Sequence, residues 1–97
     1  MIRQIWTCGS TRETWIEVRV TNECIRKRGR SVMGFSVSTL QFDRDPRIEY
    51  QDTMYFMTEG EAKVELNKRV SVLNGLGKIG VYGETAMAAR QKVWAVG

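Results

Sequence analysis

From Ile16 to Val20 the sequence alternates strictly between apolar and charged side chains (IEVRV). Successive side chains of a β-strand point to opposite faces of the sheet, so this period of two predicts a strand over residues 15–20. The alternation separates a core-facing set from a set on the other, exposed face: Ile16, Val18 and Val20 in the first, and Trp15, Glu17 and Arg19 in the second.

Three further segments of the first half carry strand patterns, at residues 2–8, 32–42 and about 47–57. The last two are separated by Asp43-Arg44-Asp45-Pro46, where the proline cannot donate a ladder hydrogen bond. Within 32–42 the apolar residues change parity, from Met33, Phe35 and Val37 to Leu40 and Phe42. Such a change predicts a bulge or bend near Thr39. In 47–57 the apolar residues share one parity, which predicts a common core-facing set: Ile48, Tyr50, Met54 and Phe56.

Residues 58–74 predict the principal helix. Thr58 and Glu61 have the spacing of a capping box, and Asn74-Gly75 supplies a C-terminal stop. Apolar residues also alternate along this segment, as they would in a hairpin turning near Asn67-Lys68. The two end signals favour the helix, because Asn-Lys is a poor tight turn.

These elements predict an α+β fold in one domain over residues 1–97. We expect a small antiparallel sheet of four to six strands, with one principal helix (about 58–74) packed on one face. Residues 78–82 and 92–96 are the candidates for the remaining strands.

The chain contains no histidine, which excludes catalytic triads and histidine-dependent metal sites and favours a protein that is not an enzyme. Cys8 and Cys24 are too far apart for a redox pair and too few for a zinc site, so we expect two reduced, largely buried thiols and no metal or cofactor. No apolar run approaches membrane-spanning length, and residues 1–10 lack the apolar centre of a signal peptide. The expected location is therefore the cytoplasm, away from membranes.

The net charge of +4 is concentrated in the first half of the chain. Residues 49–97 are neutral overall, and four of the five residues from Arg26 to Arg30 are basic. This cluster falls in the connection between two predicted strands, where a hairpin presents its charges to a partner. Arg19 and Trp15, on the face of residues 15–20 that is expected to be exposed, are added to this cluster. The predicted binding residues are therefore Arg26, Lys27, Arg28, Arg30, Arg19 and Trp15.

Two binding functions fit this cluster. Arginine and lysine at this density suit the phosphates of nucleic acid, and an exposed Trp15 would stack on a base. The alternative is a protein-interaction or inhibitor domain, of the kind that phages and mobile elements encode, that binds an acidic surface of a host protein. An exposed edge strand would also support a homodimer.

A third hypothesis is a Mg²⁺-dependent nuclease. Asp52, Glu61 and Lys63 have the D…ExK order in which two carboxylates hold the ion and the lysine positions the attacking water. Nucleases of this class carry the ExK element on a strand, whereas the capping signals predict that Glu61 lies at a helix start. The sequence therefore favours binding over cleavage.

Overall fold

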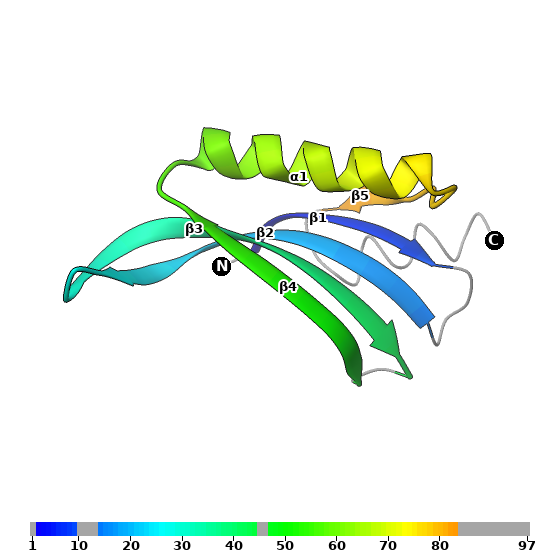
Figure 1. Cartoon of the computed structure of the whole chain (residues 1–97), viewed down its shortest axis with the longest axis horizontal. Helices are drawn as coiled ribbons and strands as arrows, with labels where there is room; N and C mark the ends of the chain where they lie inside the picture. The colour runs from blue at the N-terminus through cyan, green and yellow to red at the C-terminus, as the bar shows by residue number, and fades with distance from the viewer. Residues whose placement is uncertain (1, 10–13, 45–46, 84–97) are drawn as a thin grey trace.

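A computed structural model describes residues 2–9, 14–44 and 47–83 of the chain. In order along the chain, the elements are β1 (Ile2–Gly9), β2 (Thr14–Lys27), β3 (Arg30–Asp43), β4 (Ile48–Phe56), α1 (Glu59–Gly75) and β5 (Val81–Gly83). The strands form one antiparallel sheet in the order β4-β3-β2-β1-β5, and α1 lies across one face of it (Figure 1). The predicted α+β fold is confirmed. The strand predicted at 92–96 lies outside the described residues.

The helix prediction for residues 58–74 is confirmed over the hairpin. The Thr58 hydroxyl accepts a hydrogen bond from the Glu61 backbone N–H at 3.2 Å and donates one to the Glu61 carboxylate at 2.9 Å. The buried residues of α1 recur every fourth position, at Ala62, Leu66 and Val70. Val64, which the hairpin alternative placed on the same face as these, is 69% exposed.

The main core lies between α1 and the sheet. The even-numbered residues of β2 point toward α1 as predicted, with Val18 and Val20 fully buried and Ile16 packed beside them. The cluster is completed by β1, β3 and α1 through Trp6, Cys8, Val37, Ala62, Leu66 and Val70. At roughly 25 cal/mol per Å² of apolar surface removed from water, this packing is the main source of stability in the fold.

The sheet is also buried on its second face. Trp15, Leu40 and Phe42 form a separate cluster there, with the Trp15 and Phe42 rings stacked at 4.9 Å between centroids. The parity change in β3 therefore marks the point where its buried side chains change from the α1 face, at Val37, to the second face, at Leu40 and Phe42. The sequence predicted a bulge or bend near Thr39; the β2–β3 ladder has no bulge there, and its register runs unbroken from Thr14↔Asp43 to Lys27↔Arg30. The pairing of β3 with β4 shifts only between Gln41 and Phe42.

β2 and β3 are longer than the strands that flank them. The β1–β2 ladder ends at Ile2↔Thr21, and the β3–β4 ladder ends at Phe35↔Phe56. Beyond these pairs, residues 22–34 form a two-stranded ribbon beside which no other described strand lies; we call it the arm. Figure 1 shows the arm projecting past α1 and the rest of the sheet.

Among the described helices, none has the length and apolar character required to cross a membrane.

The packing predicts a sharp contrast between two neighbouring helix positions. Replacing Leu66, which is 1% exposed, with Ala leaves a cavity under α1 and should lower the free energy of unfolding by about 2–5 kcal/mol. Replacing Val64 with Ala should change it by less than about 0.5 kcal/mol. Urea denaturation followed by circular dichroism measures both values. Equal effects of the two substitutions would contradict the assigned helix face.

Candidate functional site

The arm ends in a two-residue turn. Arg28 and Gly29 both have positive φ, at 53° and 76°, between the paired residues Lys27 and Arg30. Positive φ at both central positions is the pattern of a type I′ turn, whose twist matches that of the flanking strands. Glycine adopts this conformation without a steric cost, so the sequence Arg-Gly is compatible with a tight tip. The turn therefore holds the basic cluster at the far end of the arm.

The four basic residues of the tip, Arg26, Lys27, Arg28 and Arg30, are all exposed. None of them forms an ion pair or a side-chain hydrogen bond with any described residue. Three other cations of the described chain are paired: Arg19 with Glu17, Lys63 with Glu59, and Arg69 with Glu65 and Asp52. The tip therefore gathers four cations that have no acidic partner among the described residues.

The cations are distributed over both faces of the arm. Arg26 has the parity of Val18 and Val20, so it lies on the α1 side of the ribbon, opposite Ser31. Lys27 and Arg30 are directly opposite each other on the other side. Like charges in a directly opposed cross-strand pair are destabilising, which leaves the tip with electrostatic repulsion that a bound anion would relieve.

Trp15 and Arg19 do not contribute to this surface, and the expectation that Trp15 is exposed was wrong. Trp15 is 4% exposed, and its indole N–H donates to Glu17 Oε1 at 2.9 Å. Arg19 Nε donates to Glu17 Oε2 at 2.8 Å, and the guanidinium lies 5.8 Å from the centre of the Phe42 ring. Glu17 itself is fully buried, so these residues form a polar cluster inside the second face. The parity change at Leu40 and Phe42 was the sequence signal for this second buried layer.

The residues of the nuclease hypothesis are not brought together as an ion-binding group. Asp52 Oδ2 lies 3.6 Å from Arg69 Nη2, and Lys63 Nζ lies 3.7 Å from Glu59 Oε1. Glu61 caps the start of α1, and residues two apart on a helix point to different sides. No group of three or more His, Cys, Asp or Glu side chains in the described chain is arranged to hold a metal ion.

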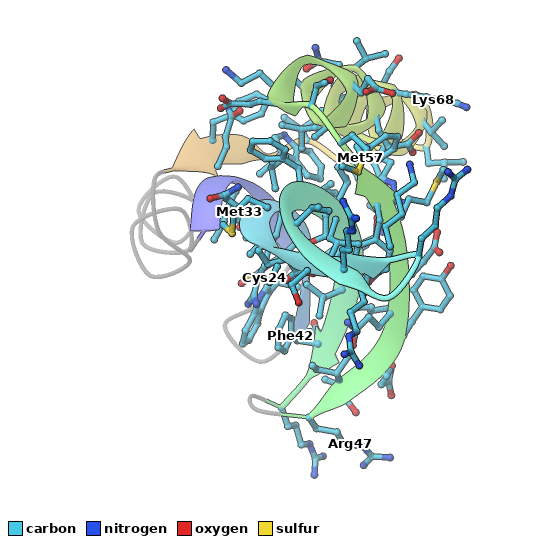
Figure 2. All side chains as sticks on the ribbon, turned by 90° about the vertical axis from the view of Figure 1, so that its left-hand side faces the viewer. Cys24, Met33, Phe42, Arg47, Met57 and Lys68 are labelled. Carbon is cyan, nitrogen blue, oxygen red and sulfur yellow. The ribbon has the colours of Figure 1, made fainter. Side chains whose placement is uncertain are left out.

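The two cysteines occupy different environments, and both are free thiols. Cys8 is buried as expected; burial raises the pKa of its thiol, against the opposing effects of the Lys78 charge and a hydrogen bond with the Ile16 backbone. Cys8 and Lys78 line a cleft of about 450 Å³ at the end of the sheet where the Trp15 and Phe42 rings lie. Cys24 is exposed, which corrects the expectation of two buried thiols; its Sγ lies 3.4 Å from Met33 Sδ on the arm (Figure 2).

The edge strand β4 carries exposed apolar side chains that the sequence pattern assigned to the core. Ile48, Tyr50 and Met54 are 45–53% exposed, and Phe56 is half-buried against the main core. Tyr55 lies on the other face and is 58% exposed. Ile48 pairs with Phe42 beyond the register shift, so it lies on that other face as well. Among the described strands, β4 pairs only with β3, so its outer backbone groups face no strand.

Comparison of the chain with protein-family models, with curated proteins and with solved structures finds no match.

The different environments of Arg19 and Arg28 predict different effects on stability. Arg19→Met removes the guanidinium from a buried carboxylate and should lower the free energy of unfolding by about 3 kcal/mol. Arg28→Asn at the exposed tip suits positive φ and should change it by less than about 0.5 kcal/mol. Chemical denaturation measures both. A destabilising Arg28→Asn together with a neutral Arg19→Met would contradict this division between structural and free cations.

Proposed function

We propose that this protein is a small, cytoplasmic, non-enzymatic binding module that engages nucleic acid through the tip of the arm. The observation that carries the proposal is the group of exposed cations at the tip that have no acidic partner among the described residues: Arg26, Lys27, Arg28 and Arg30. Each cation that contacts a phosphate releases a condensed counterion, which favours binding.

The position of these cations also supports the proposal. Charges on a ribbon that projects beyond the sheet reach an extended polyanion without a clash from α1. The direct opposition of Lys27 and Arg30 costs stability in the free protein, and two neighbouring phosphates would offset that cost. An acidic protein surface offers fewer anions per unit length, so nucleic acid fits the tip better.

Binding to a generic DNA duplex should weaken steeply with salt. If each of the four tip cations replaces one counterion, raising NaCl from about 50 to about 200 mM should lower the association constant about 100-fold. Fluorescence anisotropy of labelled duplex measures this slope. The tip variant Arg26→Ser/Lys27→Ser/Arg28→Asn/Arg30→Ser should lose most of the affinity and most of the salt dependence.

The control variant changes the same number of charges away from the tip. Arg47, Lys63, Lys68 and Lys78 are exposed, and each is replaced with Ser. Arg47 directly precedes β4, and Lys68 lies on α1 (Figure 2). This variant should retain the greater part of the affinity. No binding of the unaltered protein to DNA or RNA at about 50 mM salt would reject nucleic acid and leave an acidic protein surface as the partner.

We also propose a homodimer through β4, because this strand combines exposed apolar side chains with an edge that pairs with no other described strand. A two-fold axis perpendicular to the sheet pairs β4 antiparallel with its copy and sets residues of equal parity opposite each other. Centring the pair on Gln51 sets Tyr50 opposite Asp52, with no like charges opposed. Centring it on Asp52 would oppose two carboxylates, which is unfavourable.

The β4 pairing predicts a concentration-dependent dimer in light scattering after size exclusion. Gln51→Lys places two lysines on the axis and should shift the equilibrium to monomer, whereas Val72→Lys on α1 should leave it unchanged. Gln51→Cys should cross-link with its copy under mild oxidation. A monomer at all accessible concentrations would contradict the pairing.

A further inference from the structure

We infer that the arm enters the major groove of double-stranded DNA. This inference rests on the nucleic-acid binding proposed above and specifies which form of nucleic acid the tip recognises. Three properties of the described residues carry it: the absence of an aromatic side chain on the arm, the cross-section of the ribbon, and the position of the charges along and across it.

The arm has no surface on which single-stranded bases would stack. Residues 22–34 (NECIRKRGRSVMG) contain no Phe, Tyr or Trp. Trp15, the aromatic residue that the sequence suggested for stacking, is 4% exposed and already stacked on Phe42. Proteins that hold single strands combine a basic groove with aromatic platforms, and each stacked base contributes substantially to the affinity. The tip therefore has the charge for phosphates and lacks the platform for unpaired bases.

The shape of the arm matches one groove of one kind of duplex. A two-stranded ribbon fits the major groove of B-form DNA, which is roughly 12 Å wide and roughly 8.5 Å deep. The B-form minor groove, at roughly 6 Å, is too narrow for it. The major groove of A-form RNA is deep and narrow, and side chains cannot read it. No other described strand flanks the arm, so nothing in the described sheet blocks its entry.

The charges occupy the length of the arm that a groove of this depth would enclose. Arg26 lies only two residues from the turn, or about 7 Å at the rise of a β-strand. Glu23, the acidic residue of the arm, lies about 13 Å back from Lys27 by the same measure, so it stays outside the groove. Every cation of the arm is therefore within the enclosed part, and the one carboxylate is not.

The two-sided placement of the cations matches the two walls of the groove. Arg26 lies on one face of the ribbon, and Lys27 and Arg30 lie on the other, so each wall of phosphates meets positive charge. A flat acidic surface would engage one face and leave the other in water. Arg28 is at the first position of the turn, the most distal cation, where an arginine fork would meet guanine O6 and N7.

The test compares four labelled probes of one sequence, which contains an AATT site and several cytosines, by fluorescence anisotropy at about 50 mM NaCl. The probes are the DNA duplex, each of its single strands and the RNA duplex. The DNA duplex should bind at least about tenfold more tightly than the others. Equal or tighter binding to a single strand or to the RNA duplex would overturn the inference and leave the proposed function intact. Loss of binding to every probe would reject both.

Groove occupancy distinguishes the two sides of the duplex. A duplex with glucosylated 5-hydroxymethylcytosine, whose sugar fills the major groove, should bind about tenfold more weakly. Netropsin, which fills the minor groove at AATT, should change the affinity by less than about twofold. The tip variant and the four-residue control variant should differ on the unmodified duplex and converge on the glucosylated one. Competition by netropsin with no effect of the sugar would place the arm in the minor groove and overturn the inference.

Discussion

The unbroken antiparallel ladder between β2 and β3 determines the arrangement of almost everything else in the molecule. Its register runs from Thr14↔Asp43 to Lys27↔Arg30 without a bulge. Because a shift of one residue would send every side chain to the opposite face, this register decides which residues meet α1 and which meet the Trp15 cluster. The same register carries through to the tip, where it divides the basic residues between the two faces of the arm.

The ladder joins a well-packed half to an unsupported half. Between Thr14 and Val20 both faces of β2 carry buried side chains, so this part contributes hydrophobic packing and the ion pair between Glu17 and Arg19. Beyond Thr21 and Phe35 the ribbon has no flanking described strand, and its repulsive pair Lys27 and Arg30 reduces stability. The cations are thus located where packing contributes least and where access to a partner is greatest. This separation allows changes at the tip to alter binding without unfolding the sheet.

Local sequence patterns predicted which segments form strands and the helix. They were less successful in predicting which side chains are buried. The alternation at Ile16–Val20 and the capping box at Thr58 and Glu61 identified a strand and the helix, because each records a repeat or hydrogen bond between near neighbours. The burial of Trp15 and the exposure of Cys24 were not predicted. An alternation of apolar and polar residues separates the two faces of a strand, but it does not show whether both faces are covered. It also contains no information on where the neighbouring strands end, which determines the exposure of Cys24.

The candidate site was predictable to a similar degree. The composition of residues 26–30 indicated a basic cluster, and the strand patterns on either side placed it in a hairpin connection. The projection of the arm was not predictable, because it depends on the lengths of β1 and β4 relative to β2 and β3. Arg19 was grouped with the tip because its face of residues 15–20 was expected to be exposed, whereas its guanidinium forms an ion pair with Glu17, two residues away.

The most direct test of the account is a ¹⁵N–¹H correlation titration of the protein with a short DNA duplex. Binding by the arm predicts that the largest amide shifts fall on residues 24–32 and spread from both faces of the ribbon, while α1 and β4 stay unperturbed apart from small effects of slower tumbling. Saturable shifts confined to β4, to α1 or to the cleft beside Cys8 and Lys78, with the tip resonances unchanged, would contradict the central claim that the basic arm is the binding element.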